Sequence, residues 1–243
     1  MSAQRKKGRV SETNIAGRKA LVKYKCLIFD LDGTLVNSIY ALTYCTNRAL
    51  KRFGLGPLPE EAMMTIVGDG YKKQMERSLL AAGDTKLTHY EEILPVYLEI
   101  FGESCNYEMH AYEGIRELLE FARKRGLGLA VVSNKPHAQA VATVEYVFGK
   151  GTFDVVIGEK EGIPKKPDPT GAKTAAGRMG ACPKECLYLG DTNTDMRTGK
   201  RAGMTTVGVL WGFRGREELA ALSPDYLVQT PKDVIAIVKE ESD

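Results

Sequence analysis

The stretch KCLIFDLDGT, residues 25–34, decides the fold and raises the first chemical question. Its apolar run is nearly continuous, which is typical of a strand buried on both faces of a parallel sheet. Asp30 and Asp32 stand at the end of this run, and Gly33 and Thr34 follow at once. A buried strand has no structural need of two close carboxylates at its end, so the pair indicates a functional site.

Five more short apolar runs follow and alternate with helical patterns. They span residues 127–133, 153–158, 186–191, 205–210 and 225–228. Helices are expected over residues 114–126, 136–149, 170–180, 194–203 and 216–223. This alternation predicts an α/β fold built on a doubly wound parallel sheet.

The alternation of strands and helices is interrupted after the first strand. Residues 37–111 contain no convincing strand and suggest four helices, over 38–53, 59–67, 70–82 and 88–104. A segment this long cannot be a loop and needs a small core of its own. We therefore expect an inserted α-helical cap domain over 37–111, in a core domain formed by 22–36 and 112–243.

Charge and composition narrow the class of protein. Residues 1–25 hold eight Lys or Arg and one acidic residue, so the net charge of +3 belongs to the N-terminal end. We expect residues 1–21 to be a disordered basic tail, at most in weak contact with nucleic acid. The five cysteines are scattered and predict free thiols and no zinc site. Without a signal peptide or a membrane span, we expect a soluble, cytoplasmic monomer or homodimer.

The carboxyl ends of parallel strands meet at one edge of the sheet, where ligands bind. Besides Asp30 and Asp32, this edge should receive Ser133 and Asn134 after the second run and Lys166 after the third. Asp191 ends the fourth run, and Asp195 follows four residues later. The predicted site thus combines carboxylates, a hydroxyl and a lysine.

These residue types together suit hydrolysis of a small phosphorylated metabolite. Asp30 would attack as nucleophile and form an aspartyl-phosphate. Asp32 would act as general acid and then general base, and the nearby second carboxylate would favour its protonated form. Mg²⁺ would be held by Asp30, Asp191 and Asp32, the last through its backbone carbonyl. Lys166 and the Ser133 hydroxyl would bind the phosphoryl group.

The same residues resemble four motifs of the haloacid dehalogenase superfamily. These are DLDGT (30–34), Ser133, Lys166 within KKPDP (165–169), and GDTNTD (190–195), and they occur in that order. The resemblance implies a Rossmann-like core, a mobile cap of the C1 type and Mg²⁺ as cofactor. Within the superfamily, the chain is most similar to the phosphoglycolate phosphatases, which implies 2-phosphoglycolate as substrate. A β-phosphoglucomutase-like mutase, a pyrophosphatase and a nucleotidase remain alternatives.

The weaker assignments depend on one residue or one short segment each. Asp195 can simply begin a helix, although a metal-site role is favoured. Trp211 and Phe213 are expected to pack against the sheet rather than line the site. The cap cations are candidates to meet a substrate carboxylate: Arg48, Lys51, Arg52, Lys72, Lys73 and Arg77. The expected substrate-binding residues are Gly33, Thr34, Gly68, Asp69, Gly70, Ser133, Asn134 and Lys166.

Overall fold

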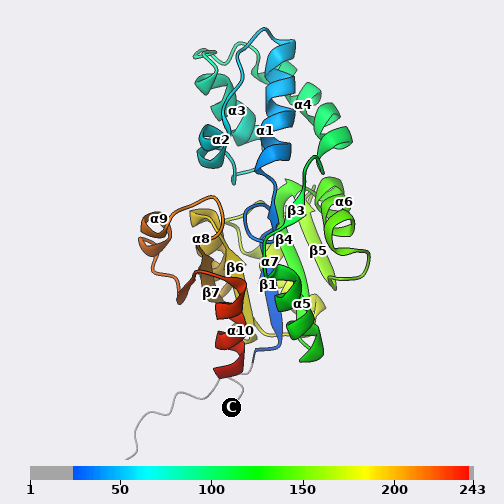
Figure 1. Cartoon of the computed structure of the whole chain (residues 1–243), viewed down its shortest axis with the longest axis vertical. Helices are drawn as coiled ribbons and strands as arrows, with labels where there is room; N and C mark the ends of the chain where they lie inside the picture. Colours follow the sequence, from blue (N-terminus) through cyan, green and yellow to red (C-terminus); the bar gives the residue numbers. More distant parts are fainter. Residues whose placement is uncertain (1–23, 241–243) are drawn as a thin grey trace, which may run out of the picture.

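A computed structural model describes residues 24–240 of the chain. The predicted basic tail, residues 1–21, lies outside the described residues. Two parts are visible in Figure 1: a bundle of helices at the top, and an open sheet flanked by helices below it.

Six parallel strands form the sheet, in the order β5-β4-β1-β6-β7-β8. The parallel α/β fold predicted from the sequence is therefore confirmed. The strands are β1 (Cys26–Phe29), β4 (Gly128–Pro136), β5 (Val155–Glu159), β6 (Cys186–Gly190), β7 (Thr205–Val209) and β8 (Tyr226–Val228).

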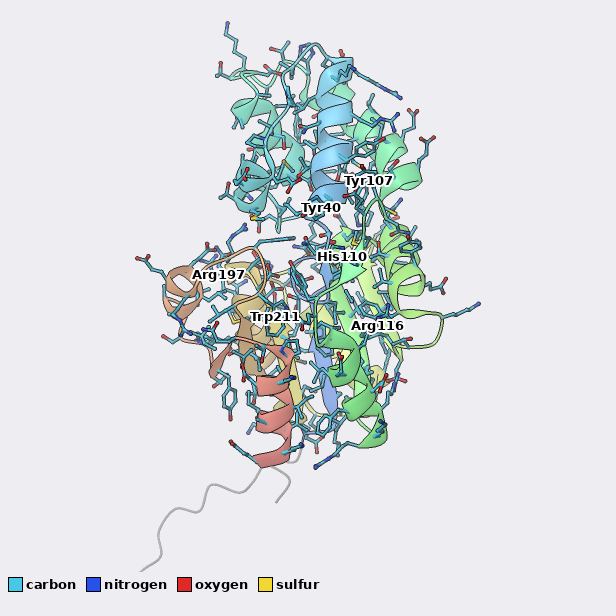
Figure 2. All side chains as sticks on the ribbon, in the orientation of Figure 1. Tyr40, Tyr107, His110, Arg116, Arg197 and Trp211 are labelled. Atoms are coloured by element: carbon cyan, nitrogen blue, oxygen red, sulfur yellow. The ribbon has the colours of Figure 1, made fainter. Side chains whose placement is uncertain are left out.

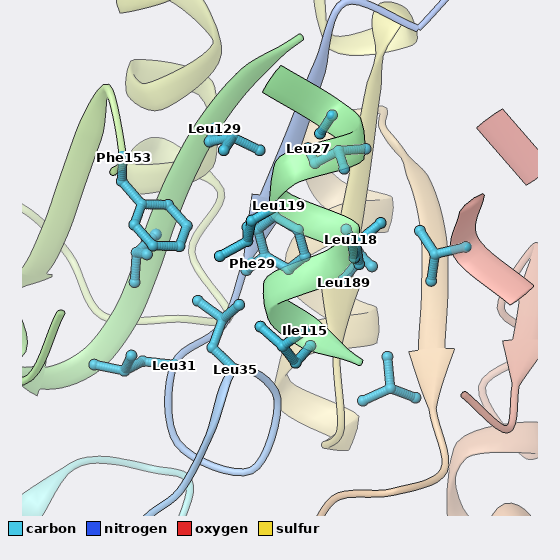
Figure 3. Close-up of a cluster of buried hydrophobic side chains, with 14 of the residues drawn as sticks. Leu27, Phe29, Leu31, Leu35, Ile115, Leu118, Leu119, Leu129, Phe153 and Leu189 are labelled. Carbon is cyan, nitrogen blue, oxygen red and sulfur yellow. The ribbon is translucent and has the colours of Figure 1, made fainter. Parts of the chain in front are cut away.

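The two faces of the sheet carry separate apolar layers because strand side chains alternate. Leu27 and Phe29 pack on the side of α5 (Ile115–Lys124), α6 (His137–Phe148) and α10 (Pro231–Glu240). Cys26 and Ile28 pack on the side of α7 (Thr170–Arg178) and α8 (Asn193–Ala202). Figure 3 shows Leu118 and Leu119 of α5 in the same apolar cluster as Phe29. All four β1 side chains are fully buried, so the strand fixes the position of Asp30 at its end.

Helices and one 3-10 turn follow the strands in the pattern expected of a doubly wound sheet. The helix α10 was not predicted: its apolar run VIAIV, residues 234–238, is short and continuous, and such a run does not by itself distinguish a helix from a strand. The elements are α5 (Ile115–Lys124), α6 (His137–Phe148), α7 (Thr170–Arg178), η1 (Pro183–Glu185), α8 (Asn193–Ala202), α9 (Arg216–Ala220) and α10 (Pro231–Glu240).

The upper bundle consists of four helices around an apolar cluster of their own. Met63, Met75, Tyr97 and Phe101 are among its fully buried side chains. The helices are α1 (Ile39–Arg52), α2 (Glu60–Ile66), α3 (Tyr71–Ala81) and α4 (Tyr90–Ser104). A separate core favours the expected cap domain over 37–111, and these boundaries stay a prediction.

Two short strands join the bundle to the sheet. β2 (Val36–Asn37) and β3 (His110–Ala111) pair antiparallel. The expectation that the inserted segment contains no strand is therefore wrong at the ends of the segment. Strands of two residues are too short to give a pattern in the sequence. In Figure 2, His110 and Tyr40 are labelled at this junction. The paired crossing holds the two chain connections together beneath the bundle.

Candidate active site

The predicted polar residues meet at the edge of the sheet that faces the helical bundle. Asp30 follows β1, and Asp191 follows β6. Ser133 lies within β4, which continues to Pro136 after an irregularity in its pairing beyond Val132. The expected strand end at Ser133 is thus three residues early.

Lys166 links two of the aspartates. Its Nζ lies 2.7 Å from Asp30 Oδ1 and 2.8 Å from Asp195 Oδ1, and its side chain is only 4% exposed. Burial alone would lower the pKa of Lys166, but Asp195 and Asp30 raise it well above its ordinary value. The lysine is therefore a fixed positive charge beside the proposed nucleophile.

Asp195 has a structural task in addition to this contact. Its Oδ2 accepts hydrogen bonds from the Thr192 backbone N–H at 3.1 Å and from Thr192 Oγ1 at 2.6 Å. This is a capping box at the start of α8, which satisfies backbone donors that a helix leaves unpaired. Asp195 therefore begins the helix and also contributes a buried carboxylate to the site.

Asp191 is held from both sides. Thr34 Oγ1 donates to Asp191 Oδ1 at 2.9 Å, and the Phe213 backbone N–H donates to Oδ2 at 2.9 Å. Glycines allow the close approach: a Cβ on Gly33, where φ is +84°, would lie 2.2 Å from Asp191 Oδ2, and one on Gly212 would lie 2.3 Å from Asp191 Cβ. The loop after β7 thus contributes directly to this aspartate's placement.

The three buried aspartates Asp30, Asp191 and Asp195 form a group that fits a metal ion. One carboxylate oxygen from each lies within 4.8 Å of the others. Burial, with Asp195 next, raises the pKa of Asp191 to about 7. Burial and Asp195 likewise raise the pKa of Asp30, while Lys166 opposes this. One lysine does not balance three buried carboxylates, and a hard divalent cation such as Mg²⁺ suits this oxygen set.

Asp32 pairs with a different lysine from the one that contacts Asp30 and Asp195. Lys135 Nζ lies 2.9 Å from Asp32 Oδ1, and the Lys135 side chain is 1% exposed. The sequence predicted Lys166 beside Asp30, and the structure has this pair. For Asp32 it suggested Asp30 as the main neighbour, whereas the structure pairs Asp32 with Lys135. The Asp32 carboxylate is not in the group of three, so its metal contact through the backbone carbonyl stays a prediction.

Asn134 connects the lysine loop to the helical bundle. Its Oδ1 accepts from the Lys166 backbone N–H at 2.9 Å, and its Nδ2 donates to the carbonyl oxygens of Lys166 and Gly68 at 3.2 and 3.3 Å. Ser133 Oγ accepts from the Lys135 backbone N–H at 3.2 Å. Asn134 therefore positions Lys166 through its backbone and also contacts the segment Gly68–Gly70.

Two further contacts fix this segment of the bundle over the sheet. Asp69 accepts a hydrogen bond from Thr194 Oγ1 at 2.8 Å and pairs with Arg77 at 2.5 Å. Arg214, which follows β7, donates to the carbonyl oxygens of Met64, Thr65 and Val67. The Thr194 and Arg214 contacts join the bundle to the sheet, whereas the Asp69–Arg77 pair lies within the bundle.

A cavity of about 40 Å³ remains between the bundle and the sheet. Among the predicted residues, Asp30, Asp32, Ser133, Asn134, Gly68 and Gly70 line it. Gly33, Thr34, Asp69, Lys166, Asp191 and Asp195 are not among its lining residues. Asp191 and Asp195 belong to the group of three, and Gly33, Thr34 and Lys166 contact that group.

Sequence reasoning missed four residues of this region. Lys135, Gly212 and Arg214 were assigned no role from the sequence. Phe213 was expected to pack against the sheet, but it lines the cavity and packs against the cluster of the bundle. Trp211 does pack against the sheet cluster, and its Nε1 donates to the Thr34 carbonyl at 2.9 Å. The run WGFR, residues 211–214, was the signal in the sequence that could have indicated these contacts, because it places aromatic residues and an arginine between a strand and a helix.

Comparison with known proteins identifies the family. Residues 27–209 match the family described as haloacid dehalogenase-like hydrolase. The chain belongs to this family. It is 30% identical over 227 residues to the phosphoglycolate phosphatase of Haemophilus influenzae, a match that covers 89% of this chain and 99% of the relative. The predicted resemblance to phosphoglycolate phosphatases and the prediction of a hydrolase are therefore confirmed.

Two further proteins extend this comparison. The pyrophosphatase PpaX of Listeria welshimeri is 29% identical over 227 residues, covering 90% of this chain and 98% of the relative. The crystal structure of a predicted phosphoglycolate phosphatase from Haemophilus somnus superposes with a TM-score of 0.82 at 28% identity, covering 88% of this chain and 98% of that one. Within residues 24–240, none of the helices has the length and apolar character that crossing a membrane requires.

Proposed function

We propose that this chain is a Mg²⁺-dependent phosphatase that hydrolyses 2-phosphoglycolate to glycolate and inorganic phosphate. The observation that carries the proposal is the meeting of Asp30 with Lys166, Asp191 and Asp195 at the end of a buried strand. Similarity to phosphoglycolate phosphatases supports the substrate. The cytoplasmic location and the monomeric or dimeric state stay predictions.

The first step is attack by Asp30 on phosphorus. Its Oδ1 is engaged by Lys166 and by the Leu31 backbone N–H at 2.7 Å, so Oδ2 is the proposed attacking atom. A bond forms between Oδ2 and phosphorus while the bond from phosphorus to the ester oxygen breaks. Asp32 gives its proton to that oxygen, and glycolate leaves as the alcohol.

In the second step, water releases the phosphate. Asp32, now ionised, takes a proton from a water molecule that attacks phosphorus, and the bond to Asp30 breaks. Lys166 and the Ser133 hydroxyl stabilise charge on the phosphoryl oxygens during both steps. When bound by Asp30, Asp191 and Asp195, Mg²⁺ would neutralise charge on the nucleophile and the phosphoryl group.

The closed bundle suits a small substrate. The cavity walls combine the carboxylates with apolar and aromatic side chains, including Leu42, Tyr97 and Phe213. Such walls exclude bulk water, which strengthens the electrostatic contacts inside. Opening of the bundle must precede entry and release, and Asp69 and Arg214 are the contacts that would break.

Phosphate release from 2-phosphoglycolate with Mg²⁺ tests the proposal. Asp30→Asn is expected to lower kcat by about 10³-fold or more, because loss of a nucleophile removes the whole covalent route. Asp233→Asn is the matched control, since Asp233 only accepts hydrogen bonds at the start of α10. Full activity of Asp30→Asn in the presence of Mg²⁺ would contradict the mechanism.

Pyrophosphate hydrolysis is the second candidate, because the Listeria relative is named a pyrophosphatase. Both substrates place a second anionic group a few bonds from the reacting phosphorus. A direct comparison of kcat/KM for 2-phosphoglycolate and pyrophosphate, at equal Mg²⁺, decides between the two. A higher value for pyrophosphate would displace 2-phosphoglycolate.

A further inference from the structure

Lys135 lies where the sheet meets the helical bundle. It belongs to β4, and its Nζ is 5.0 Å from the centre of the Phe101 ring in α4. The same atom is 2.9 Å from Asp32 Oδ1, at a position almost closed to solvent. Its ammonium group therefore lies between the proposed acid–base residue and the bundle.

The cavity walls contain one cation. Of the residues that line it within the described chain, Lys135 is the single Lys or Arg. The six cations that the sequence offered for a substrate carboxylate do not line it. Arg52 pairs with Glu99 and Lys73 with Glu76, both on the exposed surface of the bundle, and Arg77 pairs with Asp69.

We propose that Lys135 is the specificity-determining residue that binds the second anionic group of the substrate. On the proposed function, from which this inference follows, that group is the carboxylate of 2-phosphoglycolate. The phosphoryl group would lie at Asp30 and Lys166, and the carboxylate would point toward Lys135 under Phe101. A small substrate with two anionic ends is thereby preferred over a simple alkyl phosphate.

The physical reason is the cost of burying the second charge. An ionised group transferred from water into an apolar cavity is strongly disfavoured unless a partner of opposite charge meets it. Apart from the carboxylates Asp30 and Asp32, the other walls supply neutral groups, such as Gln74 and Tyr97. An ammonium group has three donors, so Lys135 can contact the incoming anion and Asp32 together.

Closure of the bundle completes this subsite. Phe101 comes from α4, whereas Lys135 and Asp32 come from the sheet. The ring covers the ammonium group only when the bundle lies down on the sheet. Binding of a substrate with two anionic ends would therefore stabilise the closed position, and a substrate without the second charge would lose that contact.

The test compares 2-phosphoglycolate with ethyl phosphate, in which a methyl group replaces the carboxylate. The wild-type protein is expected to prefer 2-phosphoglycolate in kcat/KM by about 10- to 100-fold, the value of one buried charge-assisted hydrogen bond. Lys135→Met is expected to remove this preference. Because Asp32 loses its partner for both substrates alike, the ratio of the two kcat/KM values is the readout. Lys73→Met, at the exposed surface of the bundle, is the matched control and should keep the preference.

The outcomes separate this inference from the proposed function. If the wild-type protein hydrolyses both substrates with equal kcat/KM and this activity needs Asp30, the role of Lys135 is overturned and the phosphatase function is retained. This result does not depend on whether Lys135→Met folds. A preference that survives in Lys135→Met would overturn it as well. Pyrophosphate is the third arm: loss of its turnover alone in Lys135→Met would assign the subsite to a second phosphate group, not a carboxylate.

Discussion

Gly33→Ala gives the sharpest test of how the site is assembled. Gly33 has a φ of +84°, and a Cβ there would lie 2.2 Å from Asp191 Oδ2. Gly126, which follows α5, has a φ of +71° and no atom within 4 Å of an added Cβ. The two substitutions therefore share the backbone strain and differ in the collision with Asp191.

The expected losses in the free energy of unfolding follow from the backbone strain and from the collision. A left-handed alanine costs about 1–2 kcal/mol, which is all that Gly126→Ala should lose. The collision at Gly33 adds about 1–3 kcal/mol, as overpacking does in other proteins. Each kcal/mol lowers Tm by about 2–4 °C in a chain of this size, so the two variants are readily separated.

Urea unfolding measures the difference in stability, and Mg²⁺ titration of each variant measures the effect on the site. Gly33→Ala is expected to lose more stability than Gly126→Ala and also to bind Mg²⁺ more weakly, because Asp191 must move. If both variants lose the same free energy and bind Mg²⁺ as the wild-type protein does, then Gly33 does not pack against the metal-site carboxylate.

Two further predictions concern the metal-free site and the closed bundle. Because the pKa of Asp191 is raised from 3.8 to about 7, the folded protein binds its proton more tightly than the unfolded chain, so stability rises as pH falls through this window. In EDTA, Tm should be higher near about pH 6 than near about pH 8, and excess Mg²⁺ should reduce that difference; a Tm unaffected by pH in EDTA would contradict the charge imbalance. Asp69→Ala should lower kcat/KM while costing less than about 1 kcal/mol of stability, because the Asp69–Arg77 pair is partly exposed. Glu99→Ala, which breaks a pair within the bundle only, is its control, and equal kinetics of the two would refute the closing role.

The sequence predicted those parts of the molecule that depend on local pattern. The run before Asp30 is apolar at every position, because both faces of β1 are covered, and this alone indicated a parallel sheet. Asp191 and Lys166 could be placed at the same edge, because parallel strands bring their carboxyl ends together. The six strands and most helices followed from such patterns.

Contacts between the bundle and the sheet could not be predicted in this way. Lys135 pairs with a residue 103 positions away and Arg214 reaches carbonyl groups up to 150 positions away, and no local spacing encodes either contact. The partner of Asp32 was misjudged for the same reason: nearness in sequence suggested Asp30 as its main neighbour, whereas Lys135 of β4 pairs with it. Lys166 was expected beside Asp30 and does pair with it. Gly212 matters because Asp191 and the Gly33 carbonyl both pack against it.

Covalent catalysis by Asp30 leaves a phosphoryl group on this residue during turnover, and acid quenching can trap it. The protein is mixed with 2-phosphoglycolate and Mg²⁺, quenched in acid within the first turnovers, digested and measured by mass spectrometry. The account predicts one phosphoryl group on the peptide that contains Asp30 and none in Asp30→Asn. Turnover in the wild-type protein with the phosphoryl group on another residue, or turnover that persists in Asp30→Asn, would contradict it.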